Sequence, residues 1–129
     1  MLNIDNTDKG TTFTDQFDSA ADFFRALAHP VRLALLELLR DDEACVCHLQ
    51  AVLGLRQAYI SQQLMFLRQS GLVSARRQGW NVYYRVNDPR IFEVIDRVKE
   101  LLPTPQQLSL IPEAVNCTCP RCRVTSRPA

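Results

Sequence analysis

The chain has 129 residues, of which 47% are apolar and 22% charged, and its net charge is +1. This length and composition fit one globular domain and exclude a chain that is disordered throughout or that holds two large domains. The N-terminus lacks the basic and apolar regions of a signal peptide, and the apolar run at residues 31–39 is short and interrupted by Arg32 and Glu37. We therefore expect a cytoplasmic protein without a membrane span.

The charge is unevenly distributed along the chain. Residues 1–43 sum to about −5, residues 44–87 to about +5, and the remainder to about +1. The stretch from Cys45 to Asn87 contains five Arg and no Asp or Glu. A segment that is basic throughout and begins with two thiols indicates an anion-binding surface beside a site for a soft ion.

Helical spacing of apolar residues begins after a polar segment at residues 1–15, which we expect to be a flexible arm. A first helix is predicted from Phe17 to Ala28. It should end near His29, because Pro30 disfavours the helical conformation of the residue before it. Pro30 can itself open a second helix, and residues 31–39 are apolar on nearly all sides, which is typical of a helix buried on most faces.

Two more helices follow the acidic segment at residues 41–43. A short helix over residues 46–53 is predicted to end at Gly54, because glycine readily takes the left-handed conformation that caps a helix. After a short turn, a helix over residues 57–70 places apolar side chains on one side and mostly polar ones on the other. These two helices are therefore close neighbours in the chain.

Segments 72–77 and 82–86 are rich in β-forming residues and flank the turn sequence Gln78-Gly79-Trp80-Asn81, which predicts a β-hairpin. A last helix over residues 89–102 carries an apolar stripe, and the prolines that begin at position 103 prevent further regular helix. Residues 16–102 should therefore form the folded domain, and residues 103–129 a C-terminal tail that contains three cysteines.

This order of elements predicts a mainly α fold with a small β-hairpin, the winged helix-turn-helix. In such a fold the second helix of the pair can enter a DNA major groove about 12 Å wide, while arginines on the hairpin reach phosphates. The side chains that we expect to contact DNA carry amide, hydroxyl, phenol or guanidinium groups: Arg56, Gln57, Tyr59, Ser61, Gln62, Gln63, Arg68, Arg76, Arg77 and Arg85. A solvated polar face is the alternative for the helix as a whole. Tyr59 could instead pack half-buried, and Trp80 could cap the base of the hairpin.

Several short motifs carry a family resemblance: Ala28-His29-Pro30-Val31-Arg32, Cys45-Val46-Cys47-His48-Leu49, Gly54-Leu55-Arg56-Gln57, Ile60-Ser61-Gln62-Gln63-Leu64, Leu67-Arg68-Gln69-Ser70-Gly71-Leu72-Val73 and Tyr83-Tyr84-Arg85-Val86. Over residues 18–102 the chain resembles the ArsR/SmtB family of metal-responsive repressors. The resemblance implies a homodimer joined by its first and last helices. It also implies binding to a two-fold operator and release when a metal or metalloid ion binds, which derepresses resistance genes.

The sequence departs from the family pattern at three positions. His48 replaces the usual acidic residue after Cys-Val-Cys, which could change the ion that is bound. Arg56 replaces a common serine, and Gln63 stands where histidine is frequent, which could change the operator sequence. The other familiar site of the family, a histidine and carboxylate set on the last helix, is not supported because that helix has no histidine.

Cys45 and Cys47 are candidate ion ligands. They lie at or just before a helix N-terminus, where exposed N–H groups and the helix dipole lower the pKa of a thiol. Two cysteines at this spacing are too close to complete a site, so further ligands must come from elsewhere. The candidates are Cys117, Cys119 and Cys122, because about 15 residues of extended tail reach about 50 Å, to the same subunit or its partner.

Thiolates select soft ions, so the expected inducer is As(III) or Sb(III), for which the family's sensors use three thiolates, or Cd(II) or Pb(II), which can take four. Zn(II) could also bind. As alternatives, Cys45 and Cys47 could be buried as small apolar residues, the tail cysteines could be unliganded or hold a separate zinc ion, and His48 is more typical of a surface or capping histidine than of a ligand.

A second function for the same fold is a thiol redox switch, in which an oxidant or persulfide links Cys45 or Cys47 to a tail cysteine. An enzyme that uses the Cys119-Pro120-Arg121-Cys122 sequence is disfavoured, because no βαβ pattern accompanies it. We therefore expect a DNA-binding protein and no catalysis.

Overall fold

The structure is a computed structural model that describes residues 14–103. The predicted arm at residues 1–15 and the tail at residues 103–129 thus lie almost entirely outside the described residues. The elements are α1 (Asp15–Leu27), α2 (Pro30–Leu38), β1 (Ala44–Cys45), α3 (Val46–Leu53), α4 (Gln57–Gln69), β2 (Val73–Gln78), β3 (Asn81–Val86) and α5 (Ile91–Leu101). Every predicted helix and both predicted strands are present, with ends within about two residues of the prediction.

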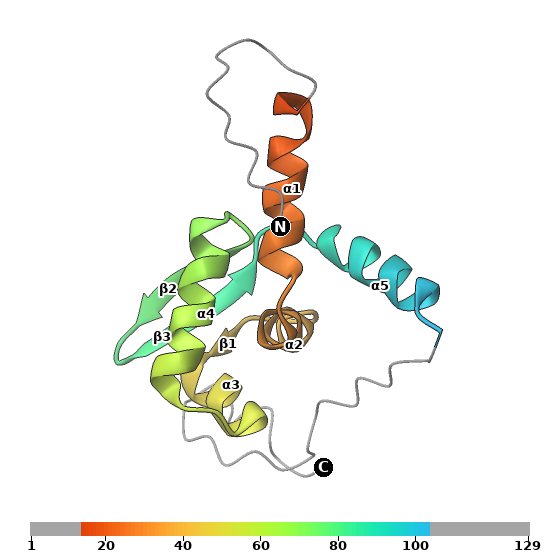
Figure 1. Cartoon of the computed structure of the whole chain (residues 1–129). Helices are drawn as coiled ribbons and strands as arrows, with labels where there is room; N and C mark the ends of the chain where they lie inside the picture. Colours follow the sequence, from red (N-terminus) through yellow and green to blue (C-terminus); the bar gives the residue numbers. More distant parts are fainter. Residues whose placement is uncertain (1–13, 104–129) are drawn as a thin grey trace.

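The elements form a body from which two helices extend. The body consists of α2, α3, α4 and a small sheet, while α1 and α5 point away from it in different directions (Figure 1). Large apolar side chains with no exposed surface fill the centre of the body: Leu35, Leu36, Leu49, Ile60, Leu64 and Leu67. The apolar side of α4 that the sequence predicts is therefore confirmed as the side that faces the core.

Local sequence signals set the ends of the central helices. His29 lies in an extended conformation and its Nδ1 accepts a hydrogen bond from the backbone N–H of Val31 at 3.1 Å, while Pro30 is the first residue of α2. Gly54 ends α3 with φ +65°, and its N–H donates to the Gln50 carbonyl oxygen at 2.8 Å. Both predicted boundaries are confirmed.

The sheet has one more strand than the sequence predicts. Its order is β1-β3-β2, and β1 pairs antiparallel with β3 through Ala44 opposite Tyr84 and Cys45 opposite Tyr83. The hairpin of β2 and β3 is confirmed, but β1 has only two residues, which are too few to show a period in sequence. The β2–β3 hairpin is called the wing from here on. The extra strand β1 connects the start of α3 to this wing.

The two faces of this sheet differ. Ala44, Ala75 and Tyr84 lie side by side in the register, and Ala44 and Tyr84 belong to or pack against the core. Because successive residues of a strand point to opposite faces, the neighbouring row of Cys45, Tyr83 and Arg76 lies on the opposite face, where Cys45 and Tyr83 are also buried.

The apolar stripe of α5 continues past the core. Ile91, Phe92 and Ile95 are buried, whereas Val98 and Leu101 near the end of α5 are exposed. No helix among residues 14–103 is long and apolar enough to cross a membrane.

Candidate DNA-binding surface and thiol site

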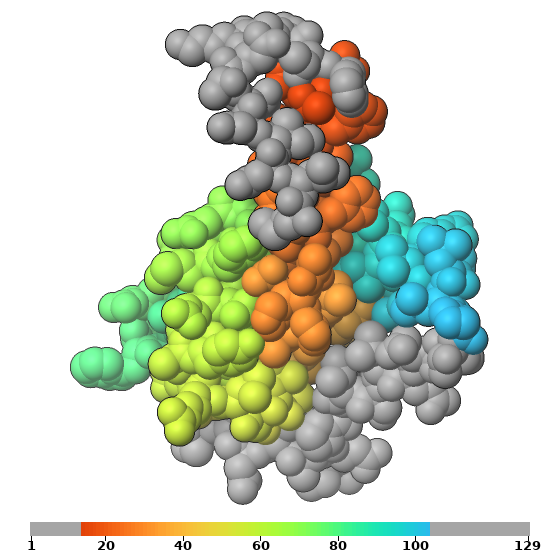
Figure 2. Space-filling model, viewed as in Figure 1, coloured from red at the N-terminus to blue at the C-terminus, as the bar shows by residue number. Residues whose placement is uncertain are grey.

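Helices α3 and α4 form the helix-turn-helix, joined by the three residues from Gly54 to Arg56. Along α4 the apolar residues Ile60, Leu64 and Leu67 face inward, which turns the polar side of the helix toward solvent. The elements that would meet DNA, α4 and the wing, lie next to each other, and the end of the wing projects from the body (Figures 1 and 2).

The predicted DNA contacts on α4 fall into two groups. Arg56, Gln57, Gln62 and Arg68 are exposed, and Ser61 is partly exposed, so these side chains can reach a ligand from solution. Tyr59 and Gln63 are partly buried and make contacts within the protein. The Tyr59 hydroxyl lies 3.4 Å from Nε2 of His29, which agrees with the half-buried alternative for this residue.

Gln63 is held by Arg32, a residue that the sequence analysis did not single out. Arg32 donates from NH1 to the Gln63 side-chain oxygen at 3.0 Å, and its guanidinium lies 4.1 Å from the ring centroid of Phe66 on the same helix. It also donates to the carbonyl oxygens of Ala26 at 2.7 Å and Arg25 at 3.0 Å. Arg32 thus connects the end of α1 to α4.

The arginines of the wing differ in whether they form an ion pair within the protein. Arg77 and Arg85 are exposed and make no ion pair with any residue between positions 14 and 103. Arg76 instead pairs with Glu43 just before β1, and this hydrogen-bonded carboxylate raises the pKa of the guanidinium. Trp80 at the turn of the wing is fully exposed, so the alternative that it caps the base of the hairpin is wrong.

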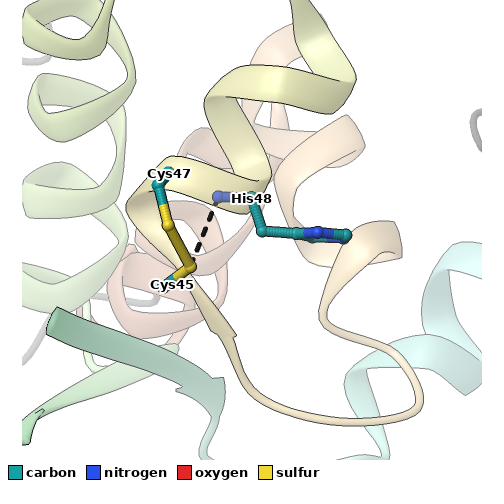
Figure 3. Close-up of a disulfide and its surroundings, with 3 residues drawn as sticks. All are labelled: Cys45, Cys47 and His48. Carbon is teal, nitrogen blue, oxygen red and sulfur yellow. Dashed lines mark hydrogen bonds between the residues drawn. A yellow bond between two sulfur atoms is a disulfide. The ribbon is translucent and has the colours of Figure 1, made fainter. Parts of the chain in front are cut away.

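Cys45 and Cys47 lie together at the N-terminus of α3, where the structure joins them by a disulfide (Figure 3). Their Cα atoms are 5.4 Å apart, within the range that a disulfide requires. The Cys45 sulfur also caps α3 by accepting a hydrogen bond from the His48 backbone N–H at 3.3 Å. Cys45 is buried and Cys47 exposed.

Reduction of this pair would place two sulfur ligands side by side, which suits a soft ion but does not complete its coordination. Among residues 14–103, no group of three or more His, Cys, Asp or Glu side chains could hold a metal ion. The His48 imidazole points away from both sulfurs (Figure 3), and burial lowers its pKa. The predicted tail ligands Cys117, Cys119 and Cys122 lie outside the described residues.

Just before α5, Asp88 and Arg90 form an ion pair. Arg90 donates to the Asp88 carboxylate from its guanidinium at 2.6 to 3.1 Å and from its backbone N–H at 3.0 Å. These hydrogen bonds lower the pKa of Asp88 to about 2. With its carboxylate engaged by a cation, Asp88 is poorly suited to bind a metal.

An apolar groove of about 370 Å³ separates the two helices that extend from the body. Its lining includes Phe24 of α1, Leu33 of α2, Val98 of α5 and Leu102 just after α5. Phe24 is 55% exposed and Leu101 83% exposed. Exposed apolar side chains gathered on two neighbouring helices are typical of a surface that a partner covers.

Comparison with known proteins identifies the class to which this fold and surface belong. Residues 29–75 match the family described as "Bacterial regulatory protein, arsR family". The chain is 42% identical over 90 residues to the transcriptional repressor SmtB homolog of Synechocystis, covering 67% of this chain and 68% of that protein. The chain therefore belongs to the ArsR/SmtB family of transcriptional repressors, which are DNA-binding regulators and not enzymes.

Solved structures agree with this assignment. Rv0081 of Mycobacterium tuberculosis matches with a TM-score of 0.61 and 37% identity over 67% of this chain and 87% of that chain. The homodimeric winged helix-turn-helix DNA-binding domain of Mb0332 from Mycobacterium bovis matches with a TM-score of 0.62 and 31% identity, over 72% of this chain and 91% of that chain. The predicted winged helix-turn-helix fold is thereby confirmed.

Two residues of the site could not be found by motif. Glu43 lies 33 positions from Arg76, and Arg32 lies 31 positions from Gln63. Arg32 does stand in the quoted motif that follows Ala28, but nothing in the sequence indicates which helix its side chain contacts. Glu43 ends the acidic segment, where the sequence shows only a break between helices.

Proposed function

We propose that this repressor binds operator DNA as a homodimer and releases it when a thiophilic ion binds the thiolates of Cys45 and Cys47. The observation that carries the proposal is the position of both sulfurs at the start of α3, the first helix of the helix-turn-helix. An ion bound there acts directly on the element that orients α4. The genes under control would be resistance genes for that ion.

The apolar surface of α1 and α5 supports the proposed homodimer. Phe24, Val98 and Leu101 are exposed in the single chain and would be covered by the same residues of a second copy. The similarity to a homodimeric winged helix-turn-helix domain supports this arrangement. A dimer places two α4 helices about one DNA turn apart, near 34 Å, so a change in their separation weakens binding to both half-sites.

The donor set favours As(III), Sb(III), Cd(II) or Pb(II), with Zn(II) as a further candidate, because every proposed ligand is sulfur. Cys45 and Cys47 supply two thiolates. One or two of Cys117, Cys119 and Cys122 would supply the rest, from the same subunit or from its partner.

The test uses the reduced protein and a labelled duplex selected by that protein from a random-sequence library. Each ion is titrated while thiolate charge-transfer absorption and DNA release, by fluorescence anisotropy, are followed in parallel. We expect the effective ion to weaken DNA binding 5- to 150-fold. Cys45→Ser and Cys47→Ser should bind DNA normally and fail to release it, since serine preserves the cap of α3 that Cys45 provides. Normal release by both variants would reject the ligand assignment.

A second candidate function is a thiol redox switch, which the disulfide between Cys45 and Cys47 favours. This pairing differs from the predicted one with a tail cysteine. Two thiols would form one S–S bond and lose two protons and two electrons, which a peroxide accepts as it is reduced to water. Ion-induced release in the presence of a phosphine reductant supports ion sensing, because a disulfide switch is silent there. Release by peroxide alone supports the redox switch.

A further inference from the structure

One residue separates the thiol site from an arginine of the wing that is predicted to contact DNA. In the sheet, Cys45 on β1 lies opposite Tyr83 on β3, and Tyr83 lies opposite Arg76 on β2. Directly opposed side chains point to the same face of an antiparallel sheet. Cys45 and Tyr83 are 2% and 4% exposed, so these two residues are packed, whereas Arg76 at the end of the row is exposed.

The guanidinium of Arg76 makes three hydrogen bonds within the protein. It lies 4.7 Å from the ring centroid of Tyr83, and its Nε donates to the Glu43 carboxylate at 2.8 Å. Its NH2 donates to the second oxygen of the same carboxylate, and its NH1 donates to the Gln78 side chain at 2.8 Å. While these bonds last, the Nε and NH2 pair of Arg76 is occupied by Glu43 and cannot hold a phosphate.

Glu43 lies at the point where the thiol site and the wing meet. It is the residue before β1, and Cys45 ends β1 and caps α3. The Glu43 side chain is only 12% exposed, whereas that of Arg76 is 47% exposed. The carboxylate is thus held by the protein, and the arginine is the partner that can leave.

We propose that Glu43 competes with DNA for Arg76 and that the row from Cys45 through Tyr83 makes this competition depend on the state of the thiols. This inference rests on the proposed function, because it needs Cys45 and Cys47 to be the sensing residues. The thiols are called engaged when they bind an ion or are joined in a disulfide, as in this structure. In the engaged state, β1 holds Glu43 against Arg76. When they are reduced and free of ion, Arg76 moves to a phosphate.

The competition has a signature in two variants. Glu43→Gln removes the competitor, so the thiol-engaged protein should bind DNA several-fold more tightly while the reduced protein changes little. Arg76→Gln removes the phosphate contact, so the reduced protein should bind more weakly while the engaged protein changes little. Both changes lower the ratio of the DNA affinity in the reduced state to that in the engaged state. This ratio should fall to less than a third of its wild-type value in both variants.

Arg77→Gln is the matched control. Arg77 lies next to Arg76 but has no ion-pair partner among the described residues, so its loss should weaken binding in both states and leave the ratio unchanged. Each lost phosphate contact should also reduce the slope of log K against log salt by about 0.9. For Arg76→Gln this reduction should occur in the reduced state alone.

The experiment measures binding of the full chain to the selected duplex in three forms: reduced, saturated with Cd(II) or As(III), and oxidised by diamide. Far-ultraviolet circular dichroism checks that every variant is folded. Trp80, the sole tryptophan, is an intrinsic reporter at the tip of the wing. Its anisotropy without DNA should change when the thiols of the wild type are engaged and should not change in Glu43→Gln.

The outcomes separate the two proposals. A wild type whose DNA affinity is the same in all three forms overturns the proposed function, and this inference with it. A wild type that responds, with Glu43→Gln and Arg76→Gln keeping its affinity ratio, overturns only the link through Glu43 and leaves the thiol sensor intact. An equal change in Trp80 anisotropy in the wild type and Glu43→Gln also overturns the link.

Discussion

Replacing Arg32 with alanine should both destabilise the fold and weaken DNA binding. The Arg32 guanidinium makes hydrogen bonds of 2.7 and 3.0 Å to the carbonyl oxygens of Ala26 and Arg25 at the end of α1. It makes another of 3.0 Å to Gln63 on α4 and lies 4.1 Å from the ring centroid of Phe66. The substitution removes all four contacts and leaves two helix-end carbonyls without this donor.

The expected magnitude follows from these contacts. A hydrogen bond that involves a charged group contributes about 1.5–3 kcal/mol, and a cation–π contact at a partly exposed site about 0.5–1 kcal/mol. These contributions are not additive, and water can replace part of what is lost. We therefore expect the free energy of unfolding to fall by about 2–4 kcal/mol. The assay is urea denaturation at one fixed protein concentration, because the stability of a dimer depends on concentration.

Arg25→Ala is the control for charge. The Arg25 side chain is 67% exposed and, among residues 14–103, forms an ion pair only with Asp22 three residues earlier; such surface pairs contribute about 0–1 kcal/mol. Arg32→Lys should fall between the two, since lysine keeps the charge and loses the planar set of donors. A loss for Arg32→Ala that is no greater than that for Arg25→Ala would refute the link between α1 and α4. Normal DNA affinity in a destabilised Arg32→Ala protein would also refute this link.

Three further measurements probe the core, the Glu37 carboxylate with its partners Arg40 and Lys99, and the proposed dimer surface. Leu64→Ala should cost about 2–5 kcal/mol in unfolding free energy, whereas its exposed neighbour Met65→Ala should cost little; equal losses would contradict the core assignment. Burial acts to raise the pKa of Glu37, but the hydrogen bonds and charges of Arg40 and Lys99 together lower it. Its contribution to stability should therefore be present above the ordinary carboxyl pKa and be lost as the pH falls through the lowered value, and Glu37→Gln should flatten this acid limb of a pH–stability curve. Leu101→Asp should shift sedimentation toward the monomer, and an unchanged dimer would place the interface elsewhere.

The order of helices and the hairpin could be predicted because each rests on a local signal. Pro30 marks the start of α2, Gly54 marks the end of α3, and the spacing of Ile60, Leu64 and Leu67 defines the buried side of α4. These signals depend on residues within a few positions of one another, so a single sequence contains them. Strand β1 was not predicted because two residues are too few to show a period. Its existence depends on pairing with β3, about 40 residues away.

The contacts of individual polar side chains could not be predicted for the same reason. Arg76 and Arg77 are adjacent residues of the same type. Only Arg76 lies opposite Tyr83 in the sheet and donates to Glu43. Gln63 was expected to face DNA, but the position of Arg32 draws it to the protein. The register of the sheet and the packing of α2 against α4 decide these cases, and neither is encoded by neighbouring residues.

The location of Cys45 would give the proposed thiol signal two routes to DNA that differ in kind. Through α3 and the short turn at Gly54, it would act on α4, whose amides and hydroxyls are predicted to contact base edges. Through β1 and Tyr83, it would act on Arg76, whose predicted target is a phosphate. A signal through the wing alone would lower affinity for every DNA sequence and reduce its salt dependence. A signal through α4 alone would lower the preference for the operator over random DNA and leave the salt dependence unchanged, so measuring both quantities in each thiol state apportions the response between the two routes.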